Sequence, residues 1–192
     1  MKILGVGLSK TGTTSLNEAL KILGLNSLHW EPERLREVLD GSDSKPDFRY
    51  YDDVDAVTDL PAAYFYDELL EAYPETKCIL TIRDETDWWK SIEAYFNKTY
   101  PAKSLEEDFL GCRERNYIYG STTAYEFLYR KKYREHNERV ISKVPSHQLL
   151  VMNIIAGDGW ETLCPFLDVP TPSVPFPHIN KGTDKSVQSN KP

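Results

Sequence analysis

An apolar strand, a glycine-containing loop and an amphipathic helix follow one another within the first 23 residues of the chain. Residues 3–6 are typical of a buried strand, and apolar residues between positions 16 and 23 recur at helical spacing. The loop between them, residues 7–14, contains two glycines. A strand that passes through a short loop into a helix is typical of the start of a parallel α/β sheet.

The same alternation continues along the chain. Further strands are predicted at residues 27–29, 56–59, 78–82 and 148–152, and helices at 32–39, 61–73, 87–96, 122–144 and 160–167, with a less regular region up to Gly120. We therefore predict an α/β fold: a single-domain P-loop-type parallel β-sheet of about five strands with helices on both faces. The domain is expected to span residues 1–180, followed by a flexible polar tail, residues 181–192.

Composition narrows the class of protein. Apolar residues make up 40% of the 192 residues, enough for a packed core. A net charge of −7 disfavours nucleic acid as the main partner, although a local cluster of positive charge can still bind a small anion. Three dispersed cysteines suggest neither a disulfide framework nor a zinc site, and the first apolar stretch is too short for a signal peptide or membrane span. We expect a cytoplasmic protein without a membrane partner.

The loop after the first strand has the chemistry of a phosphate site. Its glycines allow the backbone to approach a ligand, and the following helix N-terminus adds partial positive charge. Lys10 supplies a mobile cation, and Thr13, Thr14 and Ser15 supply hydroxyl donors. The GxxxxGK[ST] pattern of nucleotide hydrolases is not matched, since Thr13 follows the second glycine. The alternative is a glycine- and threonine-rich turn with capping hydroxyls.

A second candidate anion site follows the strand at residues 78–82. Arg83 closes this strand, where its guanidinium can hold a phosphate through two hydrogen bonds, and Ser91 follows eight residues later. Two alternatives remain. Arg83 could pair with Asp84 or Asp87, or Asp84 could bind magnesium as in a Walker B strand, which would require the missing GK[ST] loop.

Both blocks resemble PAPS-dependent sulfotransferases, PAPS being 3′-phosphoadenosine-5′-phosphosulfate. LSKTGTTSL resembles their 5′-phosphosulfate loop, and ILTIRDETDWWKSI their 3′-phosphate site. Further likeness to the compact bacterial-type branch in HNERV, GWETLCPFLDVP and PFPHIN extends it over residues 1–181. The resemblance implies PAPS as co-substrate, its desulfated product PAP and no required metal. It also implies nucleotide contacts at Lys10, Thr11, Gly12, Thr13, Thr14, Ser15, Arg83, Ser91 and, from a lysine-glycine step, Lys181.

The general base is the open question. VTDLP resembles the family's T-H-L-P segment, whose histidine is the base, but here Asp59 stands at that place. Asp59 is our candidate base, with helix capping before Pro61 as the structural alternative. His29, after the second strand, is the rival candidate because imidazole titrates near neutral pH. His136 is expected to satisfy a hydrogen bond in the core rather than to line the pocket.

The expected function is transfer of the sulfuryl group from PAPS to a hydroxyl or amine of a small-molecule acceptor. In this reading Lys10 stabilises the charge on the departing phosphate. The alternatives are an ATP-dependent small-molecule kinase and a non-catalytic nucleotide-binding protein of the same fold. A homodimer is possible, and the identity of the acceptor stays open.

Overall fold

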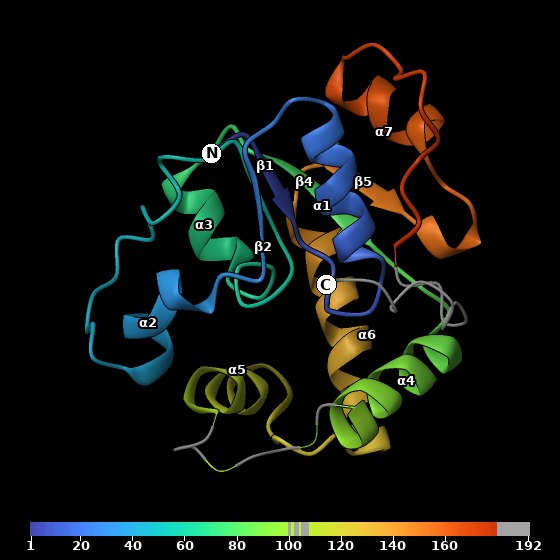
Figure 1. Cartoon of the computed structure of the whole chain (residues 1–192). Helices are drawn as coiled ribbons and strands as arrows, with labels where there is room; N and C mark the ends of the chain where they lie inside the picture. Colours follow the sequence, from blue (N-terminus) through green and yellow to red (C-terminus); the bar gives the residue numbers. More distant parts are fainter. Residues whose placement is uncertain (100, 102–103, 105–107, 180–192) are drawn as a thin grey trace, which may run out of the picture.

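The structure, a computed structural model, describes residues 1–99, 101, 104 and 108–179. Five parallel strands form one sheet in the order β2-β3-β1-β4-β5 (Figure 1). The strands are β1 (Ile3–Gly5), β2 (Ser27–His29), β3 (Ala56–Thr58), β4 (Lys77–Thr81) and β5 (Leu149–Met152). The predicted five-stranded parallel α/β sheet in a single domain is confirmed.

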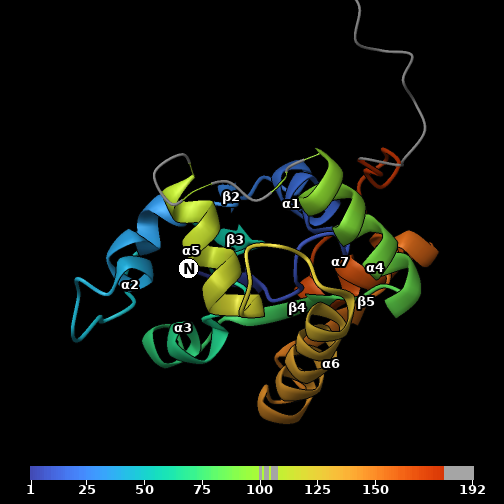
Figure 2. The same ribbon diagram turned by 90° about the horizontal axis from the view of Figure 1, so that it is seen from below.

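Helices cover both faces of the sheet (Figure 2). The helices α1 (Thr13–Ile22) and α7 (Trp160–Leu167) pack on one face, whereas α2 (Arg36–Asp40), α3 (Tyr66–Ala72) and α6 (Glu126–Lys143) pack on the other. Two more, α4 (Glu85–Glu93) and α5 (Phe109–Tyr119), lie beyond the carboxyl ends of the strands, as Figure 1 shows. No helix of the described residues is long and apolar enough to cross a membrane.

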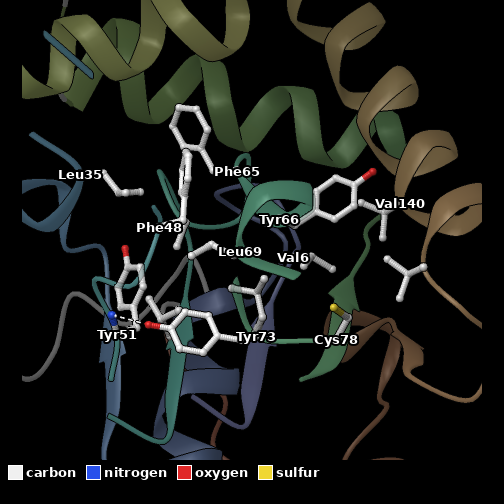
Figure 3. Close-up of a cluster of buried hydrophobic side chains, with 14 of the residues drawn as sticks. Val6, Leu35, Phe48, Tyr51, Phe65, Tyr66, Leu69, Tyr73, Cys78 and Val140 are labelled. Atoms are coloured by element: carbon white, nitrogen blue, oxygen red, sulfur yellow. Dashed lines mark hydrogen bonds between the residues drawn. The ribbon is translucent and has the colours of Figure 1, made fainter. Parts of the chain in front are cut away.

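The larger core lies between the sheet and α2, α3 and α6. Figure 3 shows Val6, directly after β1, and Cys78 of β4 facing Tyr66, Leu69 and Val140 across this layer. The hydroxyl of Tyr73 accepts a hydrogen bond of 3.0 Å from the backbone N–H of Tyr51, so this aromatic side chain is buried with its polar end satisfied. Because each buried side chain of this size stabilises the fold by about 1.5–3 kcal/mol, this layer holds the strands in place.

A third buried cluster holds α4, α5 and α6 against the loops that leave the sheet. Leu8, after β1, and Leu60, after β3, pack with Trp88, Tyr119 and other aromatic residues. Trp88 donates a hydrogen bond of 3.0 Å to the carbonyl of Ser9 and stacks on Tyr133 at 4.3 Å. The loops at the carboxyl edge are therefore held in place by apolar packing against these helices.

Several predicted helix boundaries were wrong. Residues 109–119, expected to be irregular, form α5. This helix was missed because its buried face carries Gly111, Glu114 and Arg115 and so lacks the apolar pattern that indicates a helix. Pro61 does not open a helix, since α3 begins at Tyr66. The segments at 32–39 and 87–96 were predicted as single helices. The first is a 3₁₀ turn followed by α2, and the second is α4 continued by a π-helix, Ala94–Thr99; α6 begins at Glu126 instead of Thr122.

Candidate functional site: a cavity at the carboxyl edge of the sheet

A cavity of about 400 Å³ opens where the strands end. Its wall is built from the loops after β1, β2, β3 and β4, from α4 with its π-helical extension, and from α5. Of the residues singled out in the sequence, it is lined by Lys10, Gly12, Thr13, Thr14, His29, Asp59, Arg83 and Ser91. Open α/β sheets bind ligands at this edge, so the fold brings both predicted phosphate-binding blocks to the expected place.

The loop after β1 has the backbone shape of an anion cradle. Lys10 and Gly12 both have left-handed conformations, with φ of 71° and 104°. Gly12 precedes α1 directly, and the first turn of α1 carries no acidic side chain. A left-handed residue turns successive N–H groups toward one point, and the helix N-terminus adds positive potential there. The loop can therefore hold a phosphate through backbone amides.

Lys10 lies inside this cavity. Its Nζ lies 4.5 Å from the centre of the Tyr95 ring. Burial lowers the pKa of Lys10 from its usual value; the carboxylate of Asp59 opposes this shift and the guanidinium of Arg83 adds to it. The side chains of Lys10, after β1, and Arg83, after β4, therefore place two positive charges in the same cavity.

Arg83 has spare hydrogen-bonding capacity. Its backbone N–H donates to the hydroxyl of Tyr133 at 2.9 Å, and its carbonyl accepts from the same hydroxyl at 2.8 Å, which fixes the end of β4. Within the described residues its side chain makes only a 3.5 Å hydrogen bond to the carbonyl of Lys10, and the buried Nε has no partner. An unsatisfied buried donor costs about 1–3 kcal/mol, so this guanidinium is suited to an anionic ligand.

In the structure Asp84 and Asp87 have partners other than Arg83, so the ion-pair alternative for Arg83 was wrong. Asp84 caps α4, accepting hydrogen bonds of 3.0 Å from the N–H groups of Thr86 and Asp87. Asp87 pairs with Lys90 at 3.1 Å. Among the described residues neither carboxylate forms an ion pair with Arg83, and Ser91, on α4, lines the cavity together with Arg83.

Asp59 is anchored by hydrogen bonds rather than capping a helix. Its Oδ1 accepts from the hydroxyl of Ser9 at 2.6 Å and from the N–H of Leu60 at 2.8 Å, and its Oδ2 accepts from Thr13 at 3.0 Å. No side chain caps α3. The carboxylate therefore links the ends of β1 and β3, and the capping alternative was wrong.

His29 lies against Asp59, so the two candidate bases share one site. The Nε2 of His29 is 3.5 Å from Oδ2 of Asp59 and 3.2 Å from the hydroxyl of Thr14. Its Nδ1 is 3.0 Å from the hydroxyl of Thr58, which itself donates to the carbonyl of Leu28 at 3.3 Å. Because the Thr58 proton is used in that bond, the network assigns the imidazole proton to Nδ1. Nε2 then accepts from the hydroxyl of Thr14, and both residues line the cavity.

Two of the predicted nucleotide contacts, Thr11 and Ser15, have side chains that bond within the protein. The Thr11 hydroxyl donates to the carbonyl of Leu8 at 2.7 Å and contacts Thr81, and the Ser15 hydroxyl accepts from the N–H of Ile179 at 2.9 Å. Neither side chain lines the cavity, although both contribute to the loop and the helix start. Lys181 lies outside the described residues.

His136 is buried away from the cavity, as expected. Its Nε2 donates to the carbonyl of Val6 at 2.7 Å. Burial lowers the pKa of His136 to about 4, with this hydrogen bond opposing the shift. It holds α6 to the end of β1.

Sequence reasoning missed Glu114. It lies on α5, is 4% exposed and lines the cavity, and its Oε2 accepts a hydrogen bond of 3.2 Å from the indole N–H of Trp30. Burial raises the pKa of Glu114 to about 8, and the negative charge of Asp59 adds to the shift. Since α5 itself was not predicted, nothing in the sequence placed this residue at the site.

Comparison with known proteins agrees with this arrangement. A family model described as a sulfotransferase domain matches residues 2–185. Ava biosynthesis cluster protein M of Aspergillus versicolor is 31% identical over 93% of this chain and 80% of its own length. A crystal structure of a sulfotransferase from Alicyclobacillus acidocaldarius has the same fold, with a TM-score of 0.56 and 19% identity over 91% of this chain and 83% of that one. With the family model covering nearly the whole sequence, the chain belongs to the sulfotransferase family.

Proposed function

We propose that this protein transfers the sulfuryl group of PAPS to a hydroxyl or amine of a small-molecule acceptor. One observation carries the proposal: Lys10, beside the N-terminus of α1, and Arg83, whose Nε has no hydrogen-bond partner among the described residues, face one cavity. A nucleotide with phosphates at both its 5′ and 3′ positions would satisfy both groups at once. A donor with phosphates only at its 5′ end would leave one of them unused.

The residues present fit such a co-substrate. The backbone amides around Gly12, with the hydroxyls of Thr13 and Thr14, would hold the 5′ phosphate. Arg83 and Ser91 would hold the 3′ phosphate, which gives the buried Nε of Arg83 an acceptor. Bound there, PAPS supplies a sulfuryl group already activated by its bond to phosphate.

The transfer needs charge stabilisation and a base. The acceptor oxygen or nitrogen forms a bond to sulfur, the sulfur–oxygen bond to phosphate breaks, and its electron pair leaves on PAP. Lys10 would stabilise the charge that develops on that leaving oxygen. The acceptor's proton passes to a base, for which the sequence favoured Asp59.

Hydrogen bonding favours His29 as the proton acceptor, with Asp59 positioning it. Three hydrogen bonds already occupy the carboxylate of Asp59. The Nε2 of His29 has one hydrogen-bond contact, to the hydroxyl of Thr14, and Asp59, at 3.5 Å, would stabilise the imidazolium formed there. The pair would act as a histidine base with a carboxylate neighbour.

The proposal is tested by the difference between PAP and adenosine 5′-phosphate in calorimetric titration. Arg83→Ala is expected to lose about 2 kcal/mol of binding free energy for PAP, about 30-fold in Kd, because it removes charged hydrogen bonds to the 3′ phosphate. Affinity for adenosine 5′-phosphate should be unchanged. The control is Arg36→Ala, whose guanidinium pairs with Glu33 at the surface.

Two other outcomes would replace the proposal. Equal affinity of the wild type for ADP and PAP, with magnesium-dependent turnover of ATP, would indicate the kinase alternative. Tight PAP binding without any sulfated product, from radiolabelled PAPS and a mixed acceptor library, would indicate a non-catalytic nucleotide-binding protein.

The proposal also includes a cytoplasmic, reducing location, consistent with three buried cysteines that form no disulfide, and leaves open a homodimer.

A further inference from the structure

Next to the His29–Asp59 pair, the cavity wall contains a second buried carboxyl group. Glu114 is 4% exposed, and the described residues give it one hydrogen bond, from Trp30 to Oε2. Its other oxygen has no hydrogen-bond partner among the described residues, and the residue lines the cavity. A carboxyl oxygen without a protein partner beside a cavity is available to a bound ligand.

The charged groups around Glu114 come from several elements. Asp59 follows β3, whereas Asp108 precedes α5 and Arg115 lies next to Glu114 on it. Asp108 is 3.4 Å from Arg115, so part of that positive charge is balanced locally. Burial and Asp59 raise the pKa of Glu114, whereas Trp30 and Arg115 oppose the shift, so that the carboxyl holds a proton at neutral pH.

The aromatic walls of the same cavity already accommodate cations. Lys10 Nζ lies 4.5 Å from the centre of the Tyr95 ring, and the guanidinium carbon of Arg115 lies 5.4 Å from the centre of the Phe96 ring. Trp30, which is 47% exposed, donates its indole N–H to Glu114, so its aromatic ring lies beside the carboxyl group. A carboxyl group beside an aromatic ring is a favourable site for an ammonium or guanidinium group.

We propose that the acceptor carries a positively charged nitrogen, and that Glu114 is the residue that recognises it. The inference rests on the proposed function, because in it the phosphates of the nucleotide neutralise Lys10 and Arg83 and leave Asp59 and Glu114 as the groups that a cation can balance. A neutral acceptor can share a hydrogen bond with the second oxygen of Glu114, but it brings no charge that would favour the ionised carboxylate. A cationic nitrogen satisfies it and favours its ionised form.

Binding of such an acceptor is coupled to a proton. When a cation binds beside Glu114 at pH 7, the carboxyl ionises and releases close to one proton to the buffer. A neutral ligand in the same place releases none. Proton release therefore distinguishes recognition by charge from recognition by shape.

The experiment compares matched ligands on the PAP-loaded protein: benzylamine with benzyl alcohol, and tyramine with 4-ethylphenol. By calorimetry we expect the ammonium compound of at least one pair to bind about tenfold or more tightly, with proton release seen from buffers of different ionisation enthalpy. In Glu114→Gln, whose amide oxygen still accepts from Trp30, the preference and the proton release should both disappear. The control Glu135→Gln alters an exposed carboxylate on α6 that pairs with Lys131 and Lys132.

Four results overturn the inference: equal binding within both pairs, tighter binding of the neutral compounds, a preference that survives in Glu114→Gln, or no binding of any of the four at millimolar concentration. Unchanged PAP affinity in Glu114→Gln shows that the variant is folded. If PAP itself does not bind, the proposed function fails and the inference that rests on it fails with it. If PAP binds and the ammonium preference is absent, only the inference fails.

Discussion

At the scale of single residues, Lys10 combines a left-handed backbone with a partly desolvated ammonium over Tyr95. This holds the charge in place before any ligand arrives, which is the condition for stabilising a leaving oxygen. We expect Lys10→Ala to lower kcat about 100- to 1000-fold in a sulfuryl-transfer assay, with a much smaller loss of PAP affinity. Lys21→Ala, which removes a surface partner of Glu18 at the far end of α1, is the control. Equal turnover in Lys10→Ala and the wild type would show that Lys10 has no part in the reaction.

His29 and Asp59 make separable contributions at the same scale. We expect His29→Ala to lower kcat about 100- to 10,000-fold and to abolish the acidic limb of the pH–rate profile, because the titrating base is gone. Asp59→Asn should lower kcat while keeping that limb, since the imidazole is still present. The reverse result, with the limb kept in His29→Ala and lost in Asp59→Asn, would make Asp59 the base.

The sequence predicted these residues unequally well. Lys10 and Arg83 belong to local blocks whose strand, loop or helix context can be recognised directly, and both line the cavity. The contact between His29 and Asp59 could not be predicted, because it depends on β2 and β3 being neighbours with His29 opposite Thr58. Such a register is a property of the assembled sheet and not of either segment.

At the scale of elements, α4 carries Ser91 and begins two residues after Arg83, so its position matters for the Arg83–Ser91 site. The Asp84 side chain accepts from two N–H groups of the first turn, which would otherwise lack partners. We expect Asp84→Ala to reduce the free energy of unfolding by about 1 kcal/mol, measured by denaturant titration. Asp87→Ala is the matched control, since it also removes a carboxylate from the first turn but no cap. Equal losses in both variants would mean that the helix dipole, and not the cap, accounts for the effect.

Some strands and helices could be predicted from their own sequence and others could not. Most strands were predictable because both faces of the sheet are covered, so that β1, β4 and β5 appear as short, largely apolar runs. The helix α5 was not, because its buried positions include Glu114 and Arg115 along with Gly111 and Cys112. Those polar residues face a cavity and its neighbours instead of an apolar core, which removes the periodic pattern that identifies helices.

At the scale of the whole molecule, the site exists because crossover connections place three loops from distant parts of the chain at one edge. The strand order β2-β3-β1-β4-β5 puts β1 between β3 and β4, so Lys10 lies between Asp59 and Arg83 in the order of the strands they follow. The sequence predicted the parallel sheet and its ligand edge, but not this order. Strand order follows from how the helices pack on each face, which no local pattern encodes.

Two buried titratable groups make stability depend on pH in opposite directions. The pKa of His136 is lowered from 6.5 to about 4, so its contribution is complete above pH 6.5 and is lost as pH falls through about 4, because the unfolded chain takes up the proton first. The pKa of Glu114 is raised from 4.5 to about 8, so its contribution is complete below pH 4.5 and is lost as pH rises through about 8. The two slopes oppose each other between pH 4.5 and 6.5.

Between pH 6.5 and 8 only the Glu114 slope of this pair remains, so the free energy of unfolding should fall as pH rises across that window. In Glu114→Gln that fall should be absent, and the variant should gain stability relative to the wild type by about 1–3 kcal/mol between pH 6.5 and 8, in urea titrations at both pH values. Glu135→Gln, at the surface, should follow the wild type. A wild-type curve that rises from pH 6.5 to 8, or parallel curves for the wild type and Glu114→Gln, would mean that Glu114 is already ionised in the folded protein. The cavity would then carry a permanent second negative charge beside Asp59, and the binding of a cationic ligand would release no proton.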